Sequence, residues 1–199
     1  MEQTTNDNVT KKERIEQERA KKQTAREREI RMKKMKRWIP WVIFAGIIVG
    51  LTYWAVTAAK KAEESRPGEP IAIMGQTHIA PGSEVDPYNS NPPTSGPHAG
   101  PAPWGASQTE ILEENAIHNL EHGGVWITYK DLDEASVAAL EDIARAYGLS
   151  VILSPRAANE SPIAVASWGR LMKLEAVDED LIVEYIRSNR NRSPEPLAR

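Results

Sequence analysis

The stretch VWITYKDLDEASVAALEDIARAYGLSVIL, residues 125–153, predicts a strand, a helix and a second strand in succession. Val125–Tyr129 is rich in β-branched and aromatic residues, as strands are. Asp133–Tyr147 repeats apolar side chains at helical spacing, and Gly148 ends this helix before a second apolar run at Leu149–Leu153. Outward from this unit we expect a helix over 109–122, a strand over 163–168 and a helix over 178–188. This order predicts a small α+β domain with a mixed β-sheet and two or three helices, its first crossover being right-handed.

An uncharged apolar run, WIPWVIFAGIIVGLTYWAVTAA, occupies residues 38–59, well before this domain. It is long enough to cross a hydrocarbon core of about 30 Å as a helix. Because basic residues crowd its amino-terminal flank, we predict a single-pass span of the cell membrane, with a cytoplasmic N-terminus and an extracytoplasmic C-terminal domain. The alternative is a cleaved secretory signal ending at Val56-Thr57-Ala58, but the charged leader and the apolar run are both longer than such signals usually have.

Residues 1–37 form the predicted cytoplasmic segment, with 13 Lys and Arg residues against 7 Asp and Glu residues. We expect residues 1–10 to be disordered. Residues 11–37 are strong helix formers with interleaved charges, which favours a solvated charged helix over a coiled coil. The basic cluster at 31–37 is expected to contact anionic lipid. The rest of the chain is acidic, which argues against nucleic acid as a partner.

Residues 60–70 are charged and contain two prolines, so we interpret them as a linker to an extracytoplasmic domain over residues 71–196. Residues 80–107 carry seven of the 14 prolines of the chain, which predicts a long loop without regular helix. Because this loop contains a histidine and a tryptophan, we expect it to be ordered and functional.

The chain contains no cysteine, which excludes disulfides, thiolate metal sites and cysteine nucleophiles. Its four histidines fall within 45 residues, at His78, His98, His118 and His122. The last two are four residues apart on the predicted helix, so both can reach one ion. Imidazole ligands suit copper or zinc. The sequence therefore predicts a transition-metal site, with a structural function for each histidine as the alternative.

Two further residues are possible auxiliaries of this site. Met74, four residues before His78, would add a soft ligand that favours Cu(I), although we prefer to interpret it as a core residue. Glu121 can fix a histidine tautomer from outside the coordination sphere, act as a general base or cap the helix. We prefer the first of these three functions.

The pentapeptide HNLEH at residues 118–122 also matches the H-x-x-E-H pattern of zinc peptidases, in which two histidines bind zinc and the glutamate activates water. A third ligand would have to come from a distant carboxylate such as Glu175 or Glu184. Two glycines break the helix directly after the motif, and the chain is far smaller than those enzymes. We therefore do not favour this enzymatic interpretation.

The tryptophans suggest a different use of the domain. The proline-rich loop with Trp104, Trp126 and Trp168 can form a docking surface for a cell-envelope protein, which requires the histidines to be dispersed in space. Trp126 and Trp168 stand in strand patterns, however, so we expect both in the core. Arg170 follows Trp168-Gly169 and can pair with a carboxylate of the domain or with an anionic ligand, and we expect a surface salt bridge.

Four motifs, QTHI at 76–79, PPTSGPH at 92–98, ENAIHNLEHGGVWITY at 114–129 and SWGR at 167–170, together resemble a bacterial family of membrane-anchored extracytoplasmic domains of unknown function. The resemblance covers residues 71–196. It implies a charged N-terminal segment, one membrane helix and an external domain, and it implies no activity. Relatives carry cysteines after the PPTSGPH block, where this chain has Gly105-Ala106, so a disulfide or a thiolate ligand is not essential here.

We therefore expect a membrane-tethered extracytoplasmic domain that binds a copper or zinc ion for delivery, sensing or storage. The expected ligands are His78, His98, His118 and His122, with Met74 and Glu121 as auxiliaries. A non-metal protein-interaction module of the cell envelope and a small zinc metallohydrolase are the alternatives.

Overall fold

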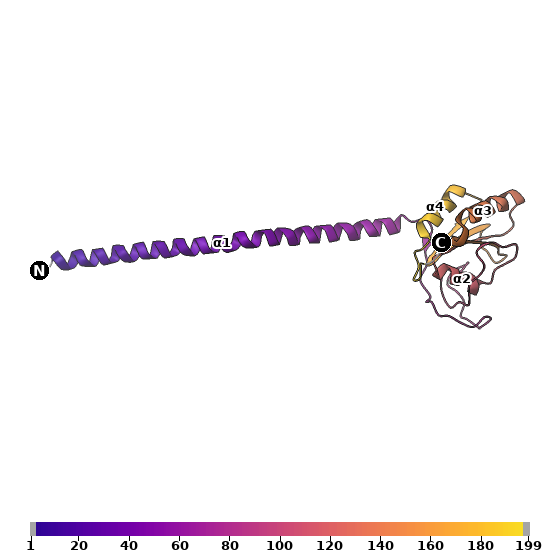
Figure 1. The fold of residues 1–199 in the computed structure, drawn as a ribbon, viewed down its shortest axis with the longest axis horizontal. Coiled ribbons are helices and arrows are strands. Elements are labelled where there is room, and N and C mark those ends of the chain that lie inside the picture. The colour runs from indigo at the N-terminus through magenta and orange to yellow at the C-terminus, as the bar shows by residue number, and fades with distance from the viewer. Residues whose placement is uncertain (1–2, 197–199) are drawn as a thin grey trace. The chain divides into compact units, whose positions relative to one another are not determined.

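The computed structural model describes residues 3–196, with their side chains from residue 13 onward. The chain divides into two compact units between Glu64 and Ser65. Figure 1 shows the first unit as one long helix, α1 (Gln3–Glu64), and the second as a folded domain that contains all the other elements.

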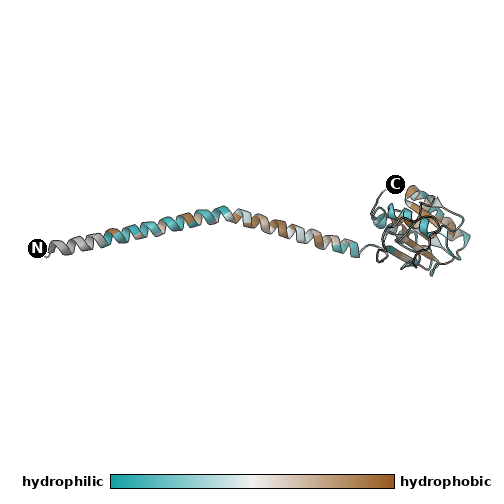
Figure 2. Cartoon of the chain, turned by 90° about the horizontal axis from the view of Figure 1, so that it is seen from below, coloured by the Kyte–Doolittle hydropathy of each residue, from teal (hydrophilic) through white to brown (hydrophobic). Residues whose placement is uncertain are grey.

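Helix α1 joins a charged first part to an apolar second part, which Figure 2 shows as a change from teal to brown. Residues 3–10, expected to be disordered, are helical, and so are residues 60–64 of the expected linker. Extending an existing helix costs less free energy than starting a new one. The helix formed by the residues between these two segments therefore continues into both of them. The apolar side chains of α1 are exposed in the structure. The helix is long and apolar enough to cross a membrane.

Pro40 lies inside α1 and not in a first helical turn, because the charged segment runs into the apolar one without a break. A proline inside a helix removes one backbone hydrogen bond and bends the helix. Figure 2 shows a bend near the change from hydrophilic to hydrophobic residues.

The described part of the domain is built on one six-stranded sheet with the order β1-β6-β5-β3-β4-β2. β4 is parallel to both β2 and β3, whereas the other neighbouring strands are antiparallel. The strands are β1 (Glu69–Pro70), β2 (Gly105–Ala106), β3 (Val125–Tyr129), β4 (Val151–Pro155), β5 (Ile163–Ser167) and β6 (Arg170–Leu174). The helices are α2 (Glu113–Glu121), α3 (Glu134–Tyr147) and α4 (Glu179–Asn189). The predicted α+β domain with a mixed sheet is confirmed.

Two elements begin later than predicted, and β6 was not predicted. The helix expected over 109–122 begins only at Glu113, because Leu112 is extended and forms the N-cap. The strand expected over 149–153 begins at Val151, because Gly148–Ser150 form a short 3-10 turn. Strand β6 has no counterpart among the predicted elements. It pairs with β5 across a tight turn in which Gly169 has a φ of +66°.

The sheet is covered on both faces. Val125 and Ile127 belong to one apolar cluster, which includes side chains of α3 and α4. Trp126, between them in β3, belongs to a second cluster with Leu120 of α2. Since side chains alternate along a strand, β3 supplies both clusters. Trp126 is fully buried as predicted, and Trp168 packs against the second cluster while half-buried.

Arg170 is not at the surface, where a salt bridge was expected. It is only 5% exposed, and its Nη1 donates to the carbonyl oxygens of Arg66 at 2.9 Å and of Gly68 at 2.7 Å. These bonds tie the segment before β1 to β6. The compact unit therefore begins at Ser65, before the residue 71 that the sequence suggested.

Helix α2 fixes the path of the proline-rich loop. Asn119 is 1% exposed; its Oδ1 accepts from the backbone N–H of Ala102 at 2.8 Å, and its Nδ2 donates to the carbonyl of Ala102 at 3.1 Å. The backbone N–H of Ala99 donates to the carbonyl of Glu114 at 3.0 Å. One buried amide thus pairs both backbone groups of a loop residue, which gives the loop a defined position on the helix.

We expect Asn119→Ala to lower the free energy of unfolding by about 2–4 kcal/mol, because two buried backbone groups lose their partner at about 1–3 kcal/mol each. Guanidinium unfolding of the full chain in detergent micelles, followed by tryptophan fluorescence, measures the change. Gln108→Ala removes an exposed amide from the same domain and serves as the control. Equal midpoints for the two variants would show that Asn119 does not hold the loop.

Candidate metal centre

Three histidines and one glutamate from distant parts of the chain meet at one point. A ligand atom from each of His78, His98, His118 and Glu121 lies within 4.8 Å of all the others. The ring centroids of His78 and His98 are 4.5 Å apart, and each lies 5.4 Å from that of His118. The side chains of His98 and Glu121 are 0% and 1% exposed, whereas that of His78 is 58% exposed. The group is therefore buried on one side and reaches solvent through His78.

Backbone pairing places His78 beside His98. The two residues form an isolated parallel bridge, in which Ile79 N–H donates to the His98 carbonyl at 2.9 Å and His98 N–H donates to that of Thr77 at 3.0 Å. His118 and Glu121 are three residues apart on α2, so they lie on one helix face. The group is thus built from a loop bridge and a helix, and no strand of the sheet contributes to it.

The hydrogen bonds of His98 define its tautomer. Its Nδ1 lies 2.8 Å from the carbonyl oxygen of Gly96. Because a carbonyl oxygen only accepts, Nδ1 carries the hydrogen, and a neutral ring then has a lone pair on Nε2. This Nε2 lies 2.9 Å from Oε2 of Glu121. At this distance the two buried atoms share a proton, which a metal ion bound by both atoms would replace.

His118 is suited to binding as a neutral imidazole. Burial lowers its pKa below the ordinary value, and the neighbouring charge of His122 lowers it further. A backbone hydrogen bond to Ala99 raises the pKa of His118 and opposes this shift in part. By hydrogen-bond geometry its buried Nδ1 has no partner in the described part of the chain. A neutral ring with an unsatisfied nitrogen is the form in which histidine binds metals.

His122 lies next to this group and not within it, in contrast to the expectation that all four histidines converge on one point. Its Nε2 is 3.0 Å from Nε2 of His118, but its ligand atoms group with those of Glu121 and Glu195. Helix α2 ends at Glu121, and His122 is its C-cap. The regular spacing of a helix therefore no longer fixes where its side chain lies.

The structure places the two predicted auxiliary residues, Met74 and Glu121, differently from the expectation. Glu121, expected outside the coordination sphere, is a central member of the group. The sulfur of Met74 accepts a hydrogen bond from the backbone N–H of Asn89 at 3.1 Å, and its own N–H donates to Ser95 Oγ at 3.0 Å. These contacts assign Met74 to the loop structure. Glu175 and Glu184 belong to neither ligand group in the described residues.

Glu195 is a possible ligand that has no local sequence signal. The chain after α4 returns to the end of α2, where Asn191 N–H donates to the Gly123 carbonyl at 2.8 Å and Glu195 N–H donates to that of Glu121 at 3.2 Å. Gly123 permits this contact: its φ is +89°, and a Cβ there would lie 2.6 Å from Oδ1 of Asn191. Gly123, two residues after the end of α2, thus also allows the C-terminal tail to contact this helix.

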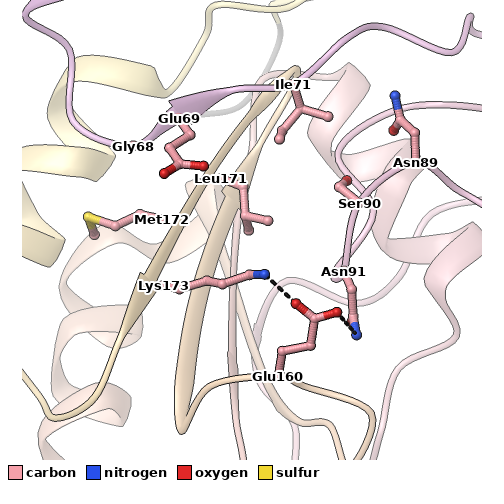
Figure 3. Close-up of a pocket in the computed structure, with 10 residues that line it drawn as sticks. All are labelled: Gly68, Glu69, Ile71, Asn89, Ser90, Asn91, Glu160, Leu171, Met172 and Lys173. Atoms are coloured by element: carbon pink, nitrogen blue, oxygen red, sulfur yellow. Dashed lines mark hydrogen bonds and ion pairs between the residues drawn. The ribbon is translucent and has the colours of Figure 1, made fainter.

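A cavity of about 420 Å³ lies elsewhere in the domain, next to β1 and β6. Figure 3 shows its lining, in which Lys173 and Asn91 both contact Glu160. None of the four histidines lines this cavity. The cavity and the metal-ligand group are therefore separate features of the domain.

A family model described as DUF3105, protein of unknown function, matches residues 78–199. The match begins at His78 and includes every residue of the two ligand groups. No curated protein and no solved structure matches the chain.

We expect His118 to titrate below pH 6.5 in the metal-free full chain, because burial and the charge of His122 disfavour the imidazolium. The unfolded chain then binds this proton more tightly than the folded one, so the domain loses stability as the pH falls below about 6.5. NMR titration of the histidine ring protons in micelles, with His118→Gln to assign the signal, measures the midpoint. A midpoint at or above 6.5 would contradict the environment described.

Proposed function

This chain belongs to the DUF3105 family, and we propose that its domain binds a divalent transition-metal ion, zinc or copper, through His78, His98, His118 and Glu121. The supporting observation is the buried Glu121 carboxylate, whose ligand atom lies within 4.8 Å of those of three imidazoles. A purely structural function for these histidines requires a partner for each buried nitrogen. Nδ1 of His118 has no such partner among the described residues.

The donor set favours some metals over others. Three imidazole nitrogens and one carboxylate oxygen suit Zn(II) and Cu(II). Binding of Cu(I) would depend on a soft ligand from Met74, whose sulfur accepts a hydrogen bond from Asn89. We therefore propose a divalent ion.

We also propose that α1 anchors the domain to the cell membrane as a single span, with residues 1–37 in the cytoplasm and the domain outside it. The apolar residues 38–59 and the basic flank at 31–37 support this orientation, since basic residues remain on the cytoplasmic side and bind anionic lipid. A tethered domain whose metal group reaches solvent through His78 suits delivery or sensing of an external metal ion better than storage.

The two alternative functions fit this geometry less well. A zinc peptidase of the H-x-x-E-H type needs His118 and His122 on one ion and a glutamate available to activate water. Here Oε2 of Glu121 lies 2.9 Å from His98 Nε2, and His122 belongs to a different group. The protein-interaction module requires dispersed histidines, and three of them lie together. A chain that binds no metal would favour the interaction module.

The proposal predicts that the full chain in detergent, stripped with a chelator and loaded with Zn(II), retains at least one equivalent after gel filtration. We expect His78→Ala to lower the zinc affinity by about 100-fold or more, because even residues that only support a ligand contribute 10–100-fold. His78 is exposed, so this variant keeps the fold. Elemental analysis and chelator competition measure both quantities.

Glu84→Gln changes an exposed carboxylate in the same loop and is the matched control. The proposal fails if the wild-type chain retains no zinc, or if His78→Ala and Glu84→Gln bind it equally.

The orientation of the anchor is testable because the chain has no cysteine. We expect a single cysteine introduced at exposed Ala146 to react with a membrane-impermeant maleimide in intact spheroplasts. One introduced at Thr24 should react only after lysis, because charged residues before the span remain in the cytoplasm. The reverse pattern of labelling would overturn the orientation.

A further inference from the structure

A second group of possible ligands adjoins the first and shares one residue with it. Ligand atoms of Glu121, His122 and Glu195 lie within 4.8 Å of one another. Nδ1 of His122 lies 3.6 Å from Oε2 of Glu195 and, though buried, has no hydrogen-bond partner among the described residues. The proposed function does not use this outer group of one imidazole and two carboxylates.

The contact between His118 and His122 links the two groups. Their Nε2 atoms are 3.0 Å apart, so in neutral rings one donates the hydrogen and the other accepts it. When His118 donates, its Nδ1 has a lone pair for a metal, and His122 holds its own hydrogen on Nδ1. When His122 donates, its own Nδ1 has a lone pair for a metal. His118 then accepts through the lone pair of Nε2 and has its hydrogen on Nδ1, so neither of its nitrogens can bind a metal. Only one of the two imidazoles can therefore bind a metal through Nδ1 at a time.

We propose that Glu121, His122 and Glu195 form an outer loading site, from which a divalent transition-metal ion passes to the inner group of His78, His98, His118 and Glu121. This inference rests on the proposed function and adds a route to it. Glu121 is a ligand at both positions, so the ion moves without leaving the protein. The chain holds one ion at a time, in one position or the other.

The transfer conserves the hydrogens of both rings. The shared hydrogen passes from Nε2 of His122 to Nε2 of His118. The hydrogen on Nδ1 of His118 is released to water as the ion binds there, and Nδ1 of His122 takes up a proton from water as the ion leaves it. Each imidazole begins and ends neutral, with one hydrogen.

Exposure and donor type support the direction of transfer. The side chains of Glu195, His122 and Glu121 are 52%, 26% and 1% exposed, in order from the surface inward. The outer group offers one imidazole and the inner group three, so an ion that prefers nitrogen ligands is held more firmly inside. A hydrogen bond from the backbone N–H of Glu195 to the carbonyl of Glu121 holds the C-terminal tail. Because this bond does not involve the Glu195 side chain, a substitution of that side chain leaves the tail in place.

The test measures Zn(II) uptake and release by the full chain in detergent, with a zinc-sensitive chelating dye in a stopped-flow instrument. We expect Glu195→Gln to slow both loading and release by about tenfold, the lower range for residues that support a metal ligand. Glu175→Gln, which changes an exposed carboxylate outside both groups, is the matched control.

A second experiment measures zinc binding when the inner group is weakened. We expect His78→Ala to retain one weakly bound zinc ion, and we expect the double variant with Glu195→Gln to lose it.

Four outcomes would overturn the inference. Rates in Glu195→Gln equal to those of Glu175→Gln, or equal binding by His78→Ala with and without Glu195→Gln, would exclude the outer site while leaving the inner one. Two zinc ions bound together in the wild-type chain would exclude alternation. A wild-type chain without zinc would overturn the proposed function and this inference together.

Discussion

The contact between the buried side chains of His98 and Glu121 is the interaction on which the proposed metal centre depends. Glu121 and His98 lie 2.9 Å apart with almost no exposure, and the Gly96 carbonyl prevents His98 from turning its N–H toward the carboxylate. Burying a charge without a partner costs several kcal/mol. The pair therefore requires a cation, and the neighbouring imidazoles of His78 and His118 make that position suitable for a metal ion.

The fold holds these groups in place through bonds that are not part of the centre. Asn119 lies between His118 and Glu121 in the sequence, yet its amide points to the proline-rich loop and pairs with both backbone groups of Ala102. One turn of α2 thus carries the ligands and also secures the loop that brings His98. Leu120, in the same turn, packs with Trp126 of the sheet. Ligand geometry, loop position and core packing are coupled through one short helix.

The proposed metal centre extends from buried ligands to partly exposed ones, an arrangement that would allow metal exchange. An ion held only by buried ligands would leave slowly, whereas exposed ligands alone would hold it weakly. The C-terminal tail adds Glu195 at the exposed end, and Gly123 allows that tail to approach.

Local sequence patterns predicted much of this protein: the long apolar helix, the β3-α3-β4 unit and the buried Trp126. They also drew attention to the four histidines, whose function stays a prediction. Such features follow from the spacing of neighbouring residues, because helical and strand periodicities are local. The tertiary structure alone decided the rest. The separation of His122 from the inner group follows the end of α2 at Glu121. Strand β6 pairs with its neighbour β5, but its other edge pairs with the distant β1. The buried Arg170, the central position of Glu121 and the arrival of Glu195 all depend on segments tens of residues apart. Contacts at that range depend on strand register and chain path, which leave no periodic signal in the sequence.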